Sequence, residues 1–231
     1  MSSFAALAEW RDKYPSLGYV APFAVVILFI AITPYVPLAA FWLWPVQVLV
    51  GLLVCFLSWP EELSMRPAFA LTSLAIGLAV FAIWVAPDVL VPGYRGGILF
   101  SNGIVGQPHS SLPLEAQRSF WVLAWRMARA TVVVPIAEEL FWRGWMMRWL
   151  INPNFQNVRL GTYAPLAFSL TALLFASEHG PYWDVGLITG IIYNWWMVRS
   201  RNVADCILMH AATNFVLSVY VLETGNWQYW M

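Results

Sequence analysis

The chain has 231 residues, of which 61% are hydrophobic and only 10% are charged, and its mean hydropathy is +0.66. A soluble domain carries about 25% charged residues, so this composition excludes an ordinary soluble domain and indicates a polytopic membrane protein. Twelve basic and twelve acidic residues give a net charge of zero, which argues against a nucleic-acid partner.

A bilayer core of about 30 Å requires roughly 20 apolar residues in each crossing helix. By this measure the sequence predicts an all-α fold with about seven transmembrane helices in one membrane domain. Its N-terminal part, residues 1–117, holds three helices and a long loop, and its C-terminal part is residues 118–231. The predicted spans are 17–33, 38–59, 67–86, 118–151, 163–179, 183–198 and 203–222.

Three segments between and within these spans carry local signals. The long loop, residues 87–117, is rich in proline and glycine, which is typical of a lid, a binding loop or a disordered connection. The segment 118–151 is too long for one upright crossing, and Pro135 within it predicts a kink, because proline lacks a backbone donor. The tail from Trp227 to Trp230 is typical of an aromatic anchor at the membrane interface.

The distribution of lysine and arginine predicts a cytoplasmic N-terminus. With that orientation two basic residues, Arg95 and Arg118, fall outside. Seven fall inside, namely Arg11, Lys13, Arg66, Arg148, Arg159, Arg199 and Arg201.

Ionised groups at membrane depth cost several kcal/mol each, so they usually face a partner or a watery cavity. Glu138, Glu139 and Arg143 lie together in an apolar run, and the i, i+4 spacing allows Glu139 to pair with Arg143. The neighbouring Glu138 points about 100° away from Glu139 around the helix axis, so it is not part of this pair and is free for another role. Arg126 and Arg129, one turn apart, are interpreted as snorkelling or structural cations.

Two further polar clusters follow, with Phe175 four residues before His179 and His210 four residues before Asn214. Either histidine alone is compatible with an interhelical hydrogen bond. Two carboxylates, two histidines and an amide on three apolar helices are costly, however, unless they converge. Counting along straight helices places His179 near the outer face and His210 nearer the inner face. We therefore expect the helices to be tilted or broken, or the predicted boundaries to be wrong.

Converging residues of these types favour amide hydrolysis. A carboxylate in a low-dielectric cavity is a competent general base for water, and histidine and asparagine donors stabilise an oxyanion. No Ser or Cys stands in a recognisable arrangement with histidine, so a covalent nucleophile is not favoured. A glutamate with two histidines is also compatible with a zinc ion, although no His-Glu-x-x-His occurs.

Three ordered motifs, Glu138-Glu139-x-x-x-Arg143, Phe175-x-x-x-His179 and His210-x-x-x-Asn214, resemble those of the CPBP intramembrane proteases. That family includes type II CAAX prenyl endoproteases and bacteriocin-processing or immunity proteins. The compact size also resembles the bacterial CAAX-protease-related subgroup that accompanies exosortase systems. This resemblance implies a protein of the bacterial inner membrane.

The resemblance implies a role for each matching residue. Glu138 would be the general base, and His179 would position or activate the water. His210 and Asn214 would form the oxyanion hole. Supporting residues would be Glu139, Arg143 and Phe175.

No metal or other cofactor is expected under this interpretation, with zinc as the alternative. The expected partners are the lipid bilayer and a membrane-anchored or lipidated peptide substrate. The rival interpretations are a zinc metallopeptidase on the same residues and a non-catalytic immunity or scaffold protein.

Overall fold

The computed structural model describes residues 13–36 and 39–230, and within these residues it is helical with no strand. Arg11 and Leu38, which bear on the predicted orientation and on the start of the second span, lie outside the described residues. The long helices are α2 (Leu17–Ile32), α3 (Ala40–Ser58), α4 (Ala70–Leu90), α8 (Pro165–Ser177), α9 (Trp183–Ser200) and α10 (Val203–Thr224). Short 3-10 turns occupy Thr33–Tyr35, Tyr94–Gly96, Ala116–Arg118, Phe155–Asn157, Gly180–Tyr182 and Trp227–Tyr229.

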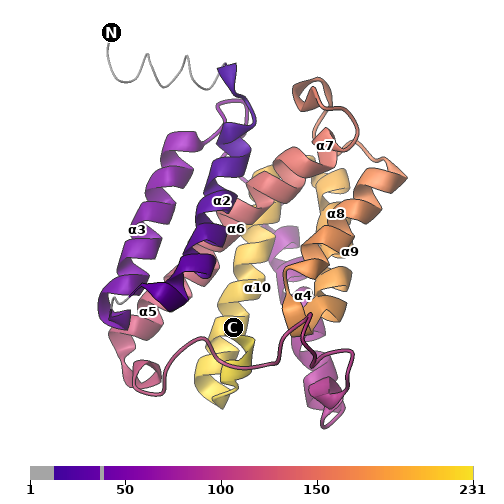
Figure 1. Cartoon of the computed structure of the whole chain (residues 1–231). Coiled ribbons are helices and arrows are strands. Elements are labelled where there is room, and N and C mark those ends of the chain that lie inside the picture. The colour runs from indigo at the N-terminus through magenta and orange to yellow at the C-terminus, as the bar shows by residue number, and fades with distance from the viewer. Residues whose placement is uncertain (1–12, 37–38, 231) are drawn as a thin grey trace.

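One further helix, which we call the diagonal helix, runs continuously from Phe120 to Trp149. Its pieces are α5 (Phe120–Ala128), α6 (Val134–Glu139) and α7 (Met147–Trp149), joined by π-helical stretches at Arg129–Val133 and Leu140–Met146. It crosses the molecule at a slant to the other helices (Figure 1), which accommodates the length that is too great for an upright crossing.

The seven predicted helices are all present, and their ends agree with the prediction to within four residues. Five of them are long and apolar enough to cross a membrane: Leu17–Tyr35, Ala40–Ser58, Ala70–Leu90, Phe120–Trp149 and Val203–Thr224. The helix α8 has only 13 residues, and α9 is less apolar. The protein is therefore an integral, multi-pass membrane protein with two helices that differ in character from the rest.

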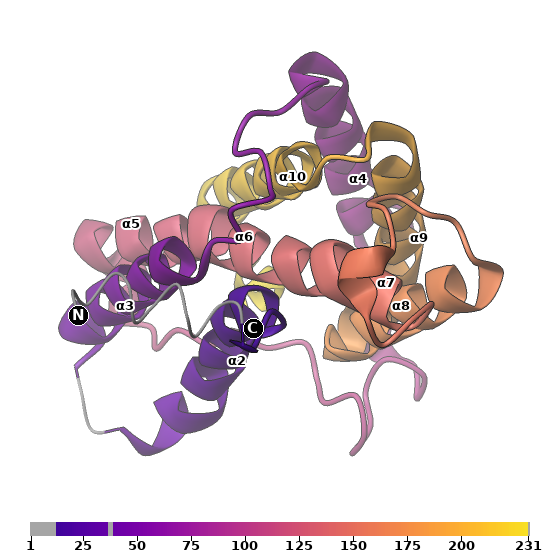
Figure 2. The ribbon, with the colours of Figure 1, turned by 90° about the horizontal axis from the view of Figure 1, so that it is seen from above.

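The helices pack as pairs around the diagonal helix. The pairs are α2 with α3, α4 with α10, and α8 with α9. Seen from above, α2 and α3 lie on one side of the diagonal helix and α10 lies on the other (Figure 2). Gly77 permits the close approach of α4 to α10, since a Cβ there would lie 2.5 Å from the carbonyl oxygen of Met209.

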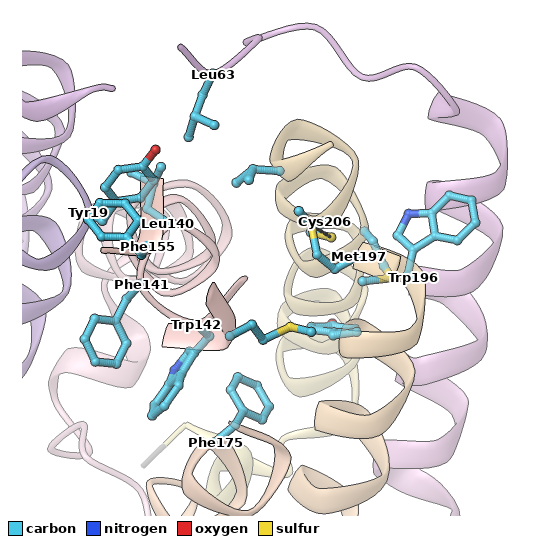
Figure 3. Packing of buried hydrophobic residues seen from close by; sticks show 14 of the residues in the cluster. Tyr19, Leu63, Leu140, Phe141, Trp142, Phe155, Phe175, Trp196, Met197 and Cys206 are labelled. Atoms are coloured by element: carbon cyan, nitrogen blue, oxygen red, sulfur yellow. Dashed lines mark hydrogen bonds between the residues drawn. The ribbon is translucent and has the colours of Figure 1, made fainter. Parts of the chain in front are cut away.

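The main core unites residues from the N-terminal and C-terminal parts of the chain. Tyr19 of α2 and Val80 of α4 belong to the same buried cluster as Leu140, Phe175 and other residues of the C-terminal part. Trp142 and Phe175 approach each other edge to face, with ring centroids 6.2 Å apart (Figure 3). The core therefore fixes the diagonal helix against α8, the two elements that carry the first two motifs.

The start of α4 is held by a buried carboxylate from α10. Asp205 accepts hydrogen bonds from the backbone N–H groups of Ala68 and Phe69 and from the Ser73 hydroxyl, at 2.8 to 3.0 Å. Ala68 and Phe69 directly precede α4, and Ser73 lies in its first turn. N–H groups at the start of a helix have no partner within the helix, so the Asp205 carboxylate satisfies two of them here. Asp205 thus has a structural task and is not part of a polar site.

The long loop is tied to the helix ends and is not a free connection. Arg95 is buried and forms ion pairs with Asp88 at 3.1 Å and Asp184 at 2.9 Å, and it also donates to the Pro181 carbonyl. This arrangement joins the loop to the end of α4 and the start of α9.

The C-terminal tail differs from the predicted interfacial anchor. Trp230 is only 3% exposed and packs in a cluster with Trp44 and Val122. The Trp230 carbonyl also accepts a hydrogen bond from the backbone N–H of Ser111. The tail is therefore part of the folded body, because it fills the space between α3 and α5.

Candidate active site

Pro135 shapes the diagonal helix just before the two glutamates. In the first π-helical stretch the N–H of Val134 bonds to the carbonyl of Arg129, five residues earlier. The same pattern would pair Pro135 with Ala130, but proline has no N–H. The Ala130 carbonyl instead accepts a hydrogen bond from Asn214 Nδ2 of α10, at 2.9 Å. The helix therefore continues through Pro135, and the unpaired carbonyl fixes α10 beside it.

Glu139 and Arg143 form the predicted buried pair. Both side chains are 0% exposed, and Arg143 Nη1 lies 3.1 Å from Glu139 Oε1. Arg143 Nε donates to Asn194 Oδ1 of α9, and its guanidinium lies over the Phe175 ring at 4.5 Å. The pair thus anchors the diagonal helix to α9 and α8.

The same Glu139 oxygen also contacts His210 Nδ1 at 2.8 Å. A carboxylate can only accept, so the Nδ1 proton of His210 points to Glu139, and a neutral ring then has no proton on Nε2. Glu139 is therefore both the partner of Arg143 and the residue that orients His210, a link between two motifs that spacing does not reveal.

Glu138 has no such partner. It is 9% exposed, and its Oε2 makes no hydrogen bond with the described residues although it is buried. Buried polar atoms are nearly always paired in folded proteins, and exceptions point to a functional role or to a bound molecule. Glu138 therefore differs from Glu139, whose carboxylate is engaged by Arg143 and His210.

His179 lies in the turn after α8, and its Nδ1 lies 2.7 Å from the carbonyl oxygen of Phe175. Since a carbonyl only accepts, Nδ1 carries the proton and Nε2 of the neutral ring is left as an acceptor. Trp84 and Phe175 flank the ring, with centroids at 5.4 and 4.6 Å. Behind it is Gly186 of α9, where a Cβ would lie 3.3 Å from the imidazole.

A cavity of about 320 Å³ collects the four predicted catalytic residues. Glu138, His179, His210 and Asn214 all line it, together with Phe175. The three motifs therefore converge on one space of the size typical of small ligand sites. A second hollow of about 500 Å³, lined by Phe69, Trp196, Val198, Arg199 and Arg201, contains none of these residues.

Counting along straight helices placed His179 and His210 at different depths, but both histidines line the same cavity. The helix α8 before His179 has 13 residues and is about 20 Å long, shorter than the bilayer core. Its ends agree with the predicted ends to within two residues, so wrong boundaries do not explain the difference. The prediction that this segment is a full transmembrane span is not supported, because α8 is shorter than the five helices that are long enough to cross a membrane.

Three charged residues that sequence reasoning left out of the site also line the cavity. Glu178 accepts a hydrogen bond from Trp142 Nε1 at 3.0 Å and shares the cavity with Glu138. Arg126 and Arg129 line the same cavity and are 7% and 6% exposed. Their spacing of three residues on the helix that carries Glu138 is the signal that could have placed them there.

The alternative of a zinc site requires at least three ligand side chains close together. Within residues 13–36 and 39–230, no three side chains of His, Cys, Asp or Glu are grouped so that they could hold a metal ion. Glu139 is engaged by Arg143, and one nitrogen of each histidine is engaged by a protein oxygen. A mechanism without metal remains our prediction.

Comparison with known proteins gives one match. The family model described as Rce1-like, type II CAAX prenyl endopeptidase Rce1-like, matches residues 120–216, a range that contains all three motifs. No curated protein and no solved structure matches the chain.

Proposed function

We propose that the protein hydrolyses a peptide bond of a membrane-associated substrate in the cavity between the diagonal helix, α8 and α10. The match of residues 120–216 to the family model of Rce1-like type II CAAX prenyl endopeptidases supports this proposal. The observation that carries this proposal is Glu138, a buried carboxylate without a partner on the wall that it shares with His179 and His210. A substrate carrying a membrane anchor or a lipid chain suits a site within the bilayer.

The attacking water is activated by Glu138 and His179. Glu138 accepts a proton as the water oxygen adds to the scissile carbonyl carbon, and His179 Nε2 accepts the second hydrogen bond of that water. The tetrahedral intermediate then collapses with cleavage of the C–N bond, and the proton held by Glu138 passes to the leaving amine. One water is consumed, and an acid and an amine are formed.

The oxyanion is stabilised by His210 and Asn214. One N–H of the Asn214 amide is bound to Ala130, which leaves the other for the oxyanion. His210 donates from Nε2 only when its ring carries both protons, since Nδ1 already faces Glu139. We therefore propose that His210 acts as an imidazolium whose charge is balanced by Glu139.

The test is peptide cleavage followed by mass spectrometry with the purified full-length protein in detergent, using membrane-anchored and prenylated peptides. Glu138→Gln should abolish cleavage, whereas Glu223→Gln, an exposed glutamate of α10 outside the cavity, should leave it unchanged. A chelator should have no effect. Loss of cleavage with chelator and recovery with zinc would favour a metallopeptidase. Cleavage that survives Glu138→Gln would refute the site.

A further inference from the structure

The second hollow, which we call the arginine hollow, lies where α4 begins and α9 ends. It has a volume of about 500 Å³ and is lined by Phe69, Trp196, Val198, Arg199 and Arg201. Phe69 directly precedes α4, and Arg201 directly follows α9. Since α4 is long enough to cross a membrane, its first residues lie near a membrane surface. The arginine hollow shares no lining residue with the cavity that holds the three motifs.

One wall of the arginine hollow is aromatic. Trp196 reaches from α9 toward α4 (Figure 3), where its indole N–H donates to the Ser73 hydroxyl at 3.1 Å. Phe69 meets the Trp196 ring edge to face, with centroids 6.1 Å apart, and is 50% exposed. Because the polar group of the indole is already bound, the two rings form an apolar wall.

The other wall is cationic. Arg199 and Arg201 are exposed, and within residues 13–36 and 39–230 neither guanidinium makes a hydrogen bond or an ion pair. Asp205 lies behind Phe69 and accepts its backbone N–H, but this carboxylate is 0% exposed and is bound by two further donors. The two guanidinium groups therefore remain available to an anion, and groups of this kind bind phosphate oxygens in pairs.

The backbone of Arg201 gives a second reason to assign a role to its side chain. Its φ is +52°, and among the described residues it is the only one other than glycine with a positive φ. Glycine is usual at this left-handed position after a helix, because a Cβ is strained there. The Arg201 N–H bonds to the Met197 carbonyl, which a glycine would do equally well. The strain is therefore not required to end α9.

The stem of Arg201 is also held in place. A Cβ on Gly161, in the connection between the diagonal helix and α8, would lie 2.8 Å from Arg201 Cγ. This connection therefore packs directly on the arginine side chain, so its guanidinium is positioned and is not a free surface group.

We propose that the arginine hollow binds the headgroup of an anionic phospholipid. Arg199 and Arg201 bind the phosphate oxygens, and Phe69 and Trp196 contact the glycerol and the first acyl carbons. The lysine and arginine distribution predicts that this end of the protein is cytoplasmic, and the cytoplasmic leaflet carries the anionic lipids. The proposal is independent of the proposed function, because none of the residues assigned to hydrolysis lines the arginine hollow.

The experiment is native mass spectrometry of the full-length protein in detergent, with phosphatidylglycerol and phosphatidylcholine of the same chain length. Both lipids carry a phosphate diester, but only phosphatidylglycerol has a net negative charge. The wild type should bind phosphatidylglycerol roughly 10- to 100-fold more tightly, since each arginine contributes about a factor of five. Arg199→Gln should lower this preference about fivefold, and adding Arg201→Gly should reduce it to about one to three.

The single variant Arg201→Gly separates binding from folding. Glycine relieves the strain of the left-handed position, so the unfolding midpoint in lipid-free detergent should not fall. The preference for phosphatidylglycerol should nevertheless fall about fivefold. A lower midpoint with an unchanged preference would mean that Arg201 serves the fold alone, and the lipid site would be refuted.

A matched control is Arg159→Gln. Arg159 is an exposed arginine two residues before Gly161 and does not line the arginine hollow. Its replacement removes the same charge near the same place and should leave the lipid preference unchanged. If it lowered the preference as much as Arg199→Gln does, the attraction would be that of a basic surface in general, which would contradict a defined site.

A soluble phosphate ester offers the same anionic chemistry. Binding of phosphatidylglycerol is therefore also measured with excess glycerol 3-phosphate, the soluble part of the headgroup. The lipid should stay bound, because its apolar part contacts Phe69 and Trp196. If glycerol 3-phosphate displaced the lipid from the wild type, the arginine hollow would be a site for a free anion, and the assignment to a phospholipid would be wrong.

Discussion

Removing the charge of Glu139 tests whether one carboxylate serves both stability and catalysis. Glu139 Oε1 contacts Arg143 at 3.1 Å and His210 at 2.8 Å, and neither Glu139 nor Arg143 is exposed. Glu139→Gln therefore leaves a fully buried guanidinium without its anion, which costs about 3–5 kcal/mol. For a chain of this size that corresponds to a fall in the unfolding midpoint of roughly 6–20 °C.

The second effect of Glu139→Gln is on His210. Without a carboxylate at Nδ1, the imidazolium that we propose as an oxyanion donor loses its balancing charge. We expect kcat to fall by about 10²- to 10⁴-fold, in the range seen when the acid that orients a catalytic histidine is neutralised in other hydrolases. Thermal unfolding in detergent and peptide cleavage by mass spectrometry measure the two effects separately.

A double replacement separates them further. Glu139→Leu with Arg143→Met removes both charges, so much of the stability lost in Glu139→Gln should return. Activity should stay low, since His210 still lacks its partner. If the double variant recovered activity along with stability, Glu139 would act only through folding and the role proposed for His210 would be refuted.

Three further outcomes are expected from single contacts. Gly186→Ala should reduce cleavage on the order of 10- to 100-fold with little loss of stability, because its Cβ would press on the ring of His179, and unchanged kinetics would contradict this. Asp205→Asn should lower stability by about 1–3 kcal/mol in thermal unfolding and leave kcat/KM unaltered, because it weakens the start of α4 and Asp205 does not line the cavity. Asn214→Ala should cost about 1–3 kcal/mol, and adding Pro135→Ala, which supplies the missing N–H, should restore stability without activity.

The helices could be predicted from the sequence because each is a long apolar run ended by polar residues or proline. In a bilayer every backbone group must be satisfied within the helix, so apolar length alone is a strong signal. Pairing of Glu139 with Arg143 also followed from sequence, since residues four apart always share a helix face. Both kinds of inference depend only on contacts within one helix.

Contacts between helices were not accessible in this way. The hydrogen bond from His210 to Glu139 joins residues 71 positions apart, and the bond from Asn214 to Ala130 joins residues 84 positions apart. Spacing within a motif gives no information on which atoms meet across the cavity. The motifs identified the residues, but the state of each ring nitrogen follows only from the oxygen that it contacts.

The position of Arg126 and Arg129 along the diagonal helix suggested snorkelling cations, but the structure buries both side chains. Near the outer end of a long apolar segment, Arg126 and Arg129 satisfy every sequence criterion for snorkelling cations. The diagonal course of the helix and the packing of Trp44 and Trp230 over the arginines bury both side chains beside the cavity. A cation that snorkels needs water at its tip, whereas Arg129 is only 6% exposed and lines the same cavity as Glu138. Both arginines therefore belong to the wall of the space that holds the three motifs, which spacing along one helix does not show.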